Sequence, residues 1–499
     1  MFRRILIANR GEIAVRIIRA LREANIRSIA VFSDADRGAL HVRLADEAAH
    51  IGPAPSAESY LRVDRILEAA KMHAAEAIHP GYGFLSENAD FAAACEEAGI
   101  VFIGPSPQSI RWLGSKTAAR ILAKRAGAPV VPGSEGPVAN IEHARLLARQ
   151  IGYPVLLKAA AGGGGKGVRR VDAEHELEAA LRDASSEAER AFHNGEIYIE
   201  KLILKPRHVE IQIAGDQHGN LVHLGERECS LQRRYQKIVE ECPSPFVAQH
   251  PEMRSRMGEA ALKVARAAEY YNLGTVEFLT DQHGDFYFLE VNTRLQVEHP
   301  VTELVTGYDL VQLQLRIAAG EALPFAQKDV AWRGWAMECR VTAEDPESNF
   351  LPSPGKIEQL REPGGPGVRL DSGVYPGWRV PLEYDALLAK LIAWGPDRNT
   401  AIQRLERALT EYSITGLKTD VPFCREILDD PEFRAGNLST EFIPDFLARR
   451  NTAAEPPHDL DLAVALAAVA HFQGRPARVE TTQAESSRWL TEGRSKLLQ

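Results

Sequence analysis

The sequence predicts an α/β protein of several domains, and three stretches of the chain support this class. The first residues alternate short apolar strands with helices, a glycine-rich stretch joins two later strands, and a hairpin carries facing carboxylates. Strands that alternate with helices are typical of a parallel sheet covered by helices. With 499 residues, the chain is long enough for about three domains, each with its own core.

The N-terminal segment is predicted to alternate strand, helix and strand up to about residue 113. Residues 4–8 form a short apolar strand, and residues 28–32 form the next one. Between these strands, residues 13–24 carry apolar side chains at helical spacing on one face. The pattern indicates a parallel sheet at the start of the chain.

A glycine-rich stretch lies between a strand that ends at Lys158 and a strand predicted over residues 168–171. Its glycines at 162–165 and 167 let backbone N–H groups approach an anion, and Lys158 and Lys166 add positive charge. The dinucleotide-binding form of this motif requires a helix next, and the phosphate-loop form requires G-K-[ST], so neither fits. We therefore predict a flexible hairpin lid over phosphates; the alternative is a mobile surface loop without a ligand.

A predicted hairpin over residues 274–292, with a His-Gly tip at 283–284, carries the strongest signal of a site. Symmetric pairing about that tip places Glu277 directly opposite Glu290. Facing like charges destabilise a sheet, so a cation should neutralise them. Mg²⁺ takes oxygen ligands from carboxylates and nucleotide phosphates, and Asn292, on the same face as Glu290, can add a carbonyl oxygen. The alternative is a solvated polar face of an edge hairpin.

The alternation continues beyond the hairpin, so that a row of polar side chains follows Asn292 on one face. The row contains an anion holder (Arg294), a hydrogen-bonding partner (Gln296) and a candidate general base (Glu298). Such a set beside a metal–phosphate site suggests activation of a small anionic oxygen nucleophile against a γ-phosphate. His208 alternates with apolar neighbours, which predicts a half-buried strand in which a single histidine is more often structural than catalytic.

The composition disfavours several other classes of protein. The formal net charge of −9 argues against sequence-independent binding to nucleic acid or to anionic membranes, because both need clustered Lys and Arg. Five scattered cysteines without a C-x-x-C pair argue against a disulfide framework or a zinc site. The apolar runs are too short for a signal-peptide core or a membrane span. We therefore expect a cytoplasmic protein with no nucleic-acid partner and no membrane partner.

Together, these stretches make the chain resemble the biotin carboxylase subunits and domains of the biotin-dependent carboxylases, within the ATP-grasp superfamily. The likeness covers about residues 1–447. It rests on Ile7-Ala-Asn-Arg-Gly-Glu-Ile-Ala14, His79-Pro-Gly-Tyr-Gly-Phe-Leu-Ser-Glu-Asn88, Gly162 to Gly167, Gln232-Arg-Arg-Tyr-Gln-Lys237, Glu290-Val-Asn-Thr-Arg-Leu-Gln-Val-Glu-His299, and Glu338-Cys-Arg340 leading into Leu351-Pro-Ser-Pro-Gly-Lys356.

The resemblance implies an ATP-grasp enzyme with an N-terminal Rossmann-like domain, a mobile glycine-rich lid and a C-terminal mixed α+β domain. The implied divisions are an N-terminal domain at 1–113, a helical connector at 114–130, a lid subdomain at 131–203, a catalytic core at 204–334, a C-terminal domain at 335–448, and a linker and tail at 449–499. In the tail we expect an Ala-rich helix at about 459–472, and docking of partner subunits is one hypothesis for its role.

The resemblance also implies which residues bind the nucleotide and the metal. Glu277 and Glu290 would bind Mg²⁺ or Mn²⁺, with Asn292 close by, and Lys237 would position the γ-phosphate of ATP. Residues 200–202 would surround the adenine. The implied ATP contacts are Lys116, Lys158, Gly164, Gly165, Glu200, Lys201, Leu202, His208, Gln232 and Lys237.

For the acid substrate, the resemblance implies that Arg294, Gln296 and the Val297 backbone hold bicarbonate and that Glu298 deprotonates it. The product would be carboxyphosphate, which breaks down to CO₂ and phosphate. Phosphate would then take the proton from biotin N1′, and Arg340 would stabilise the resulting enolate. The biotin pocket would be lined by Tyr82, Gly83 and Arg340.

The family attaches biotin at a Met-Lys hairpin, whereas Lys71-Met72 has the reverse order in a predicted helix. We therefore expect two partners, a separate biotin carboxyl carrier protein or domain and a carboxyltransferase subunit, and the family suggests a homodimer. The reaction would be the first half-reaction of a carboxylase such as acetyl-CoA carboxylase of fatty acid biosynthesis or propionyl-CoA carboxylase. Tyr235, where family members commonly carry His, puts the nucleotide contacts at that position in doubt.

Two alternatives remain at the level of the sequence. Another ATP-grasp ligase, such as a carbamoyl-phosphate synthetase or an amino-acid ligase, would share the lid and the acidic hairpin. Two features distinguish a biotin carboxylase from such a ligase: the row of Arg294, Gln296 and Glu298, and the combination of Arg340 with Tyr82. A non-catalytic homologue would have lost some of the charged residues implied in the site, and every one of them is present.

Overall fold

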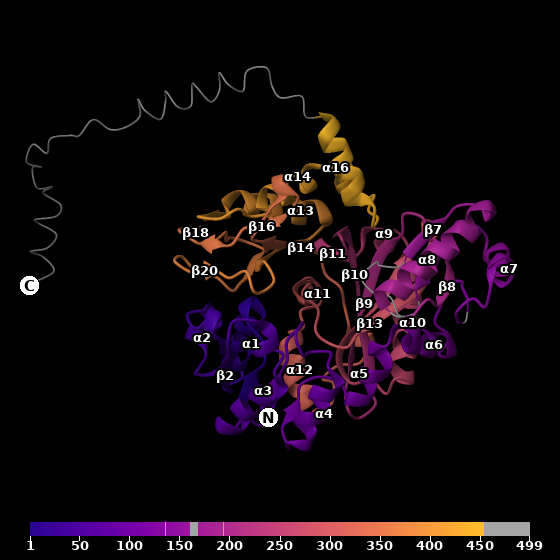
Figure 1. Cartoon of the computed structure of the whole chain (residues 1–499). Coiled ribbons are helices and arrows are strands. Elements are labelled where there is room, and N and C mark those ends of the chain that lie inside the picture. Colours follow the sequence, from indigo (N-terminus) through magenta and orange to yellow (C-terminus); the bar gives the residue numbers. More distant parts are fainter. Residues whose placement is uncertain (135, 160–167, 193, 454–499) are drawn as a thin grey trace, which may run out of the picture. The chain divides into compact units, whose positions relative to one another are not determined.

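The computed structural model of the chain, drawn in Figure 1, describes residues 1–134, 136–159, 168–192 and 194–453. Two compact units make up the chain, residues 1–444 and 445–499, and the predicted site residues that are described all belong to the first. The predicted lid glycines Gly164 and Gly165 and the helix expected over 459–472 lie outside the described residues. Among the described residues, no helix combines the length and apolar character that a membrane span needs.

The N-terminal segment folds into the predicted parallel sheet, in the order β3-β2-β1-β4-β5, with every neighbouring pair parallel. The order reverses between β1 and β4, and such sheets bind ligands at the carboxyl ends of the strands flanking that point. The loop with Tyr82 and Gly83 follows β4 there. The elements are β1 (Arg4–Ile7), α1 (Gly11–Glu23), β2 (Arg27–Ser33), α2 (Leu40–Leu44), β3 (Glu47–Gly52), α3 (Val63–Met72), β4 (Ala77–His79), α4 (Ala89–Glu97), β5 (Val101–Phe102) and α5 (Pro107–Gly114).

The strands predicted on either side of the glycine-rich stretch are confirmed. They are β6 (Val155–Ala159) and β7 (Val168–Val171), which pair antiparallel, and β8 (Ile197–Lys201) pairs with the other edge of β6. This small sheet has its own apolar core with helices α7 (Ile141–Ile151) and α8 (Leu177–Phe192). The predicted helical connector contains α6 (Lys116–Arg125).

An eight-stranded sheet in the order β13-β12-β9-β10-β11-β14-β21-β19 forms the centre of the molecule. It continues across the division expected between the catalytic core and the C-terminal domain at 334/335, because β14 pairs with β11. The domain limits therefore stay predictions, and strands from both parts can contribute side chains to one site. The strands are β9 (Arg207–Gly215), β10 (Leu221–Arg233), β11 (Gln236–Cys242), β12 (Asn272–Thr280), β13 (Phe286–Asn292), β14 (Trp335–Thr342), β19 (Val368–Ser372) and β21 (Leu387–Gly395).

The remaining elements include several helices that pack against this sheet. Helix α10 packs against β9 and β10, α11 against β10 and β14, and α13 against β14 and β21. They are α9 (Pro245–Gln249), α10 (Pro251–Ala267), α11 (His299–Thr306), α12 (Leu310–Ala318), β15 (Glu344–Asp345), β16 (Leu351–Pro352), β17 (Gly355–Lys356), β18 (Gln359–Arg361), β20 (Arg379–Val380), α13 (Arg398–Glu411), β22 (Ser413–Thr415), α14 (Val421–Asp429), α15 (Pro431–Ala435) and α16 (Phe442–Ala453).

The β12–β13 hairpin confirms the predicted facing pair, because Glu277 lies directly opposite Glu290. The pairing is not symmetric along the whole hairpin. Phe278 faces Phe288, so a bulge lies between this pair and the glutamates and shifts the register by one residue. An extra residue in one strand re-aims the side chains beyond it. Here the bulge places the two carboxylates opposite each other on one face.

Two expectations about strands were wrong. The polar row beyond the hairpin is not a strand, because β13 ends at Asn292 and residues 293–298 form a loop that leads into α11. The segment around His208 is not half-buried, because β9 is buried on both faces from His208 onward. Glu210 and Gln212 are 0% exposed there, since the guanidinium of Arg227 on β10 covers them and binds both.

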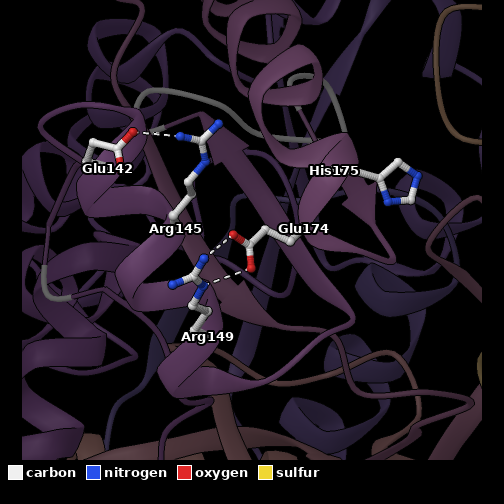
Figure 2. Close-up of a pocket in the computed structure, with 5 residues that line it drawn as sticks. All are labelled: Glu142, Arg145, Arg149, Glu174 and His175. Atoms are coloured by element: carbon white, nitrogen blue, oxygen red, sulfur yellow. Dashed lines mark hydrogen bonds and ion pairs between the residues drawn. The ribbon is translucent and has the colours of Figure 1, made fainter.

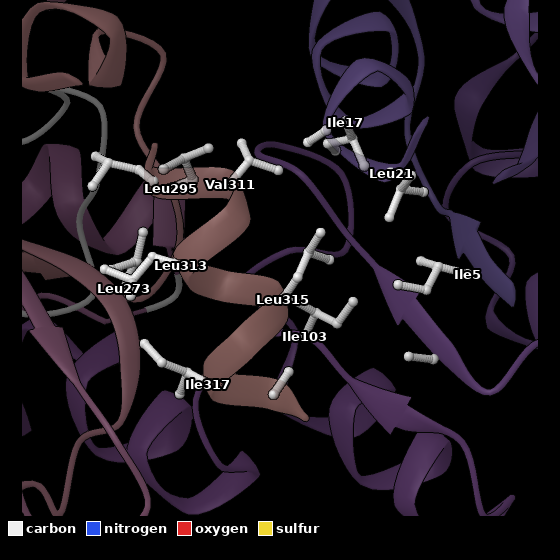
Figure 3. Packing of buried hydrophobic residues seen from close by; sticks show 14 of the residues in the cluster. Ile5, Ile17, Leu21, Ile103, Leu273, Leu295, Val311, Leu313, Leu315 and Ile317 are labelled. Carbon is white, nitrogen blue, oxygen red and sulfur yellow. The ribbon is translucent and has the colours of Figure 1, made fainter. Parts of the chain in front are cut away.

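Helix α12 joins the N-terminal sheet to the large sheet, as Figure 3 shows. Its apolar side chains Leu313, Leu315 and Ile317 are buried in one cluster with Ile5 and Leu295. The polar residues Gln312 and Arg316 of α12 are only partly buried, so the helix is covered on most of its surface. The cluster thus anchors the loop 293–298 through Leu295, which is 0% exposed.

Asp420, immediately before α14, gives a prediction for the pH dependence of stability. Burial raises the pKa of Asp420 to about 7, although the hydrogen bond that its carboxylate accepts from the Thr342 N–H lowers this pKa. Between the ordinary carboxyl pKa and about 7, the folded protein holds a proton that the unfolded chain releases, so stability falls as pH rises through this window. Asp420→Asn keeps an acceptor without the charge. The unfolding free energy of the variant, relative to that of the wild type, should increase by about 3 kcal/mol from pH 5 to pH 8.

Thermal or urea unfolding of both proteins at pH 5 and pH 8 measures this difference. The matched control is Asp397→Asn, which removes an aspartate that caps α13 and accepts the Thr400 N–H. Hydrogen bonds lower the pKa of Asp397, so its carboxylate is ionised at both pH values and the effect of this control should be equal at pH 5 and pH 8. A gain for Asp420→Asn that is equal at the two pH values would contradict the prediction.

Candidate active site

The facing carboxylates Glu277 and Glu290 differ in their surroundings. Glu277 Oε1 accepts hydrogen bonds from Lys237 Nζ (3.2 Å), Asn292 Nδ2 (2.8 Å) and Gln296 Nε2 (3.0 Å). Glu290 is half-buried, and Lys116 Nζ lies 3.0 Å from its Oε2. Burial would raise the pKa of Glu277, but Lys237 outweighs it and holds this pKa well below its usual range. Each of the two facing carboxylates therefore has a lysine ammonium beside it.

Lys237, on β11, lies between three carboxylates. Its Nζ is 2.6 Å from Glu210, 3.2 Å from Glu277 and 2.7 Å from Glu298. The negative charges around this ammonium exceed its own charge. A nucleotide triphosphate that enters here needs further positive charge, which a divalent cation supplies.

Glu298 is the residue before α11 and is 0% exposed. Its Oε1 accepts from Lys237 Nζ, and its Oε2 accepts from Arg340 Nη2 at 3.0 Å. Burial would raise the pKa of Glu298, but Lys237, Arg340 and Arg227 hold it well below its usual range. The predicted general base is thus an ionised carboxylate that two cations fix in place.

The predicted anion holder, Arg294, is fixed by several neighbours. Its Nη2 donates to Asn292 Oδ1 and its Nη1 to Gln296 Oε1, both at 2.9 Å. Its Nε donates to Glu87 Oε2 at 3.0 Å, and Glu87 Oε1 also accepts from the Thr293 N–H. The polar row therefore converges on one site although it is a loop and not a strand.

The donor set of Glu277, Glu290 and Asn292 fits a hard divalent cation. Two carboxylates and an amide oxygen are ligands that Mg²⁺ or Mn²⁺ prefers, with phosphate oxygens completing the shell. The donor atoms of His208, Glu210 and Glu277 also lie close enough to one another, within 4.8 Å, to share a metal ion. Glu210, however, is 0% exposed and bound by both Arg227 and Lys237, whereas Glu290 of the facing pair is half-buried and accessible to a ligand. The facing pair on the hairpin is therefore the better metal site.

His208 and Gln232 are held together beside the facing carboxylates. Gln232 Nε2 donates to His208 Nδ1 at 2.8 Å, and His208 Nε2 lies 2.9 Å from Glu277 Oε2. The His208 ring thus lies between Gln232 and the carboxylate of Glu277. His208 is on β9, and Gln232 is on β10, where it pairs with Lys237 of β11. These two predicted ATP contacts therefore border the candidate metal site.

A second group of predicted ATP contacts lies on the small sheet. Lys158 Nζ forms an ion pair with Glu200, and Arg120 Nη1 lies 3.4 Å from the same carboxylate. Lys116 and Arg120 are one turn apart on α6, so this helix links Glu290 of the large sheet to Glu200 of the small one. The nucleotide contacts thus come from two sheets connected by α6.

The remaining predicted ATP contacts, and Tyr235, lie as follows. The side chain of Lys201 points to the backbone, because its Nζ donates to the carbonyls of Gly152 (2.9 Å) and Tyr153 (3.2 Å). The Leu202 N–H donates to the Pro154 carbonyl. Tyr235 lies at the tip between β10 and β11, and 77% of its surface is exposed. The predicted contacts Gly164 and Gly165 are outside the described residues.

The residues predicted to line a biotin pocket lie where the N-terminal sheet meets the large one. Tyr82 Oη is buried and has no hydrogen-bond partner among the described residues, and Lys390 Nζ lies 5.9 Å from the centre of the Tyr82 ring. Gly83 has φ +69°, a conformation that favours glycine. Arg340 reaches the site from β14, and its Nε donates to Glu240 Oε1 at 2.6 Å.

Several site residues were missed at the level of the sequence. Arg227 is 0% exposed and binds Glu210, Gln212, Thr275 and Thr302. Neither Arg227 nor Glu240 has a clear signal in the sequence, because other charged residues stand beside each in its strand, Glu226 and Glu228 on β10 and Glu241 on β11. Glu87 lies in the motif from His79 to Asn88, but no role was predicted for it.

A surface hollow of about 460 Å³ lies apart from these residues, on the small α/β segment (Figure 2). Its charged lining is paired internally, because Arg149 binds Glu174 and Arg145 binds Glu142. It contains no predicted site residue. It is lined by Glu142, Arg145, Arg149, Glu174 and His175.

Comparisons with known proteins cover nearly the whole chain. Family models match for the biotin carboxylase N-terminal domain (1–110), the ATP-binding domain of the carbamoyl-phosphate synthase L chain (115–326) and the biotin carboxylase C-terminal domain (338–445). A biotin carboxylase from a Nostoc species is 54% identical over 444 residues, which are 89% of this chain and 99% of that protein. A pyruvate carboxylase subunit from Methanothermobacter thermautotrophicus is 53% identical, over 91% of this chain and 92% of its own.

A solved structure gives the same result. The biotin carboxylase domain dimer of Hydrogenobacter thermophilus 2-oxoglutarate carboxylase, in complex with MgADP, ADP and bicarbonate, is similar with a TM-score of 0.82 and 47% identity. The similarity covers 89% of this chain and 98% of that one. The fold and the site define an ATP-grasp enzyme. The chain belongs to the biotin carboxylase family.

Proposed function

We propose that this chain uses ATP and bicarbonate to carboxylate biotin held on a separate carrier protein. The observation that carries this function is the position of Glu298, a buried ionised carboxylate fixed between Lys237 and Arg340. Beside it lies the facing pair Glu277 and Glu290. A base, an anion holder and a metal–phosphate site in one place are what the activation of bicarbonate by ATP requires.

The nucleotide is bound between the two sheets, with Lys116 and Lys158 near its phosphates and Lys237 at the γ-phosphate. Mg²⁺ or Mn²⁺ held by Glu277 and Glu290, with Asn292 close by, would neutralise the charge of the phosphates. His208 and Gln232 border the same phosphates. Support comes from the excess of carboxylates around Lys237, which leaves the triphosphate charge to be met by other cations.

Bicarbonate is held by Arg294, Gln296 and the Val297 backbone. Glu298 takes its proton, and a bicarbonate oxygen then forms a bond to the γ-phosphorus while the bond to ADP breaks. The product, carboxyphosphate, splits into CO₂ and phosphate. Because Arg294 is already tied to Glu87 and its neighbours in the loop, it is oriented before the substrate arrives.

Biotin is carboxylated in the same site. The released phosphate takes the proton from N1′, and that nitrogen forms its bond to CO₂. The Arg340 guanidinium stabilises the negative charge that develops on the biotin oxygen. Tyr82 and Gly83 line the pocket, at the carboxyl end of β4 in the N-terminal sheet.

The partners we propose are a second copy of the chain, a biotin carboxyl carrier protein or domain, and a carboxyltransferase subunit. The similar proteins are named for different acceptors, pyruvate and 2-oxoglutarate among them, so the transferase determines the final acceptor. An acyl-CoA such as acetyl-CoA or propionyl-CoA is the acceptor that we propose first. The cytoplasm is the proposed location, because the five cysteines are buried as free thiols.

The purified chain should release phosphate from ATP with Mg²⁺ and bicarbonate, and free biotin should stimulate this release. Phosphate release with and without each component measures the dependence. Hydrolysis that ignores biotin but responds to another acid or an amine would contradict the biotin assignment and favour a different ATP-grasp ligase. No hydrolysis by folded protein under any of these conditions would favour a non-catalytic homologue.

A further inference from the structure

Lys390, on β21, is a lysine without a role in the reaction described above. It is 0% exposed, which is rare for lysine, because the ammonium group loses its hydration on burial. Its Nζ donates to the backbone carbonyl of Val297 at 2.9 Å. It also forms ion pairs with Glu12 (3.3 Å) and Asp371 (3.9 Å). One buried cation thus connects α1, β19 and the loop that holds the proposed bicarbonate site.

The register of the large sheet pairs Lys390 with a catalytic arginine. Lys390 lies directly opposite Arg340 on β14 and opposite Asp371 on β19. Arg340 Nη2 binds the carboxylate of Glu298, while Lys390 Nζ binds the carbonyl of Val297. Two neighbouring cations on adjacent strands therefore hold two successive residues of the same loop.

The rest of the loop is fixed at other points. The Thr293 N–H donates to Glu87, and Leu295 is buried in the apolar cluster around α12. These contacts hold the first half of the loop. The Lys390 hydrogen bond holds its second half, where the peptide after Val297 leads into the base Glu298.

We propose that Lys390 is a positioning residue for bicarbonate, which orients the Val297 carbonyl and thereby the backbone between Gln296 and Glu298. The inference rests on the proposed function. The competing explanation is that Lys390 only balances the buried charges of Glu12 and Asp371. That need is small, because Asp371 is already bound by Arg369 at 2.8 Å. Burial also raises the pKa of Glu12 to about 7, so this carboxyl can be protonated near neutral pH.

The test uses Lys390→Met in the full chain, which keeps the length of the side chain and removes the donor. The expected result is a KM for bicarbonate that rises about 10-fold or more, while the KM for ATP changes by less than about 2-fold. The matched control is Glu12→Gln, which removes the ion-pair partner and leaves the Val297 hydrogen bond. Its KM for bicarbonate should stay within about 2-fold of the wild type.

The double variant Lys390→Met/Glu12→Gln separates positioning from charge balance. Its thermal midpoint should stay close to that of Lys390→Met, because burial raises the pKa of Glu12 to about 7 and little uncompensated charge is left for the second change to remove. Its KM for bicarbonate should stay high. A KM that returns to the wild-type value in the double variant, or that is unchanged in Lys390→Met, would overturn the inference.

Amide hydrogen exchange of segment 293–298 gives a readout that does not depend on the reaction. Exchange should be faster in Lys390→Met and in the double variant than in the wild type and in Glu12→Gln. If the wild type shows no response to bicarbonate or biotin, the proposed function fails, and exchange still decides whether Lys390 holds the loop. Equal exchange in all four proteins would overturn the inference by itself.

Discussion

Glu298→Gln is expected to lower kcat for bicarbonate-dependent, biotin-stimulated phosphate release by about 10²–10⁴-fold, the usual contribution of a general base. The amide cannot take the proton from bicarbonate. In the wild type, Lys237 and Arg340 each donate to one carboxylate oxygen. The amide has a single acceptor oxygen, and its NH₂ group cannot accept from either cation. Steady-state phosphate release at saturating ATP and bicarbonate measures the loss.

The control for Glu298→Gln is Glu226→Gln. Glu226 is another buried carboxylate, 1% exposed, and it binds Arg254 at 2.7 and 2.8 Å outside the site. This control should retain most of the activity at temperatures where both variants are folded. Comparable losses in the two variants would mean that burial and not base catalysis explains the effect. Nearly full activity of Glu298→Gln would remove Glu298 from the proposed mechanism.

The largest expected loss of stability follows from Arg227→Met. The Arg227 guanidinium is 0% exposed, and its Nε lies 2.5 Å from Glu210. Without Arg227, Glu210 shares the Lys237 ammonium with Glu277 and Glu298, so its charge is incompletely compensated. Breaking a buried ion pair in this way costs about 3–5 kcal/mol. The thermal midpoint should therefore fall by several degrees, and urea unfolding should show the same direction.

Two further variants test the cause of that loss. Arg407→Met removes a surface pair with Glu411 and should change stability by about 0–1 kcal/mol. Adding Glu210→Gln to Arg227→Met should recover part of the loss, because the uncompensated carboxylate is then gone. A double variant less stable than Arg227→Met alone would show that lost packing, and not unpaired charge, dominates.

The sequence predicted those features that depend on local patterns. The alternation of apolar strands and helices predicted the N-terminal sheet, and hairpin symmetry predicted that Glu277 faces Glu290. Both follow from periodicities that the backbone imposes over a few residues. Motif resemblance identified the family, which the similarity to known biotin carboxylases confirms. The roles of individual residues remain predictions.

Local patterns failed where the surroundings decide the outcome. Alternating polarity in β9 predicted one solvated face, yet Glu210 is buried because Arg227 from the neighbouring strand neutralises it. Continued alternation after Asn292 predicted a strand, yet the chain forms a loop there. Alternation with a period of two shows which side chains point to the same face of a strand. It does not show whether that face is covered by other side chains or by solvent.

By itself, the sequence determined the fold class, the facing carboxylates and the family of this protein. Only the tertiary structure brought Arg340 and Lys390 to the loop that contains Glu298, because the pairings of β14 with β11 and β21 join segments about 50–100 residues apart. Which charges meet across such distances depends on strand order in the sheet. A buried charge is tolerated only where that order supplies its partner, so the structure and not the local pattern decides which cation fixes the proposed base.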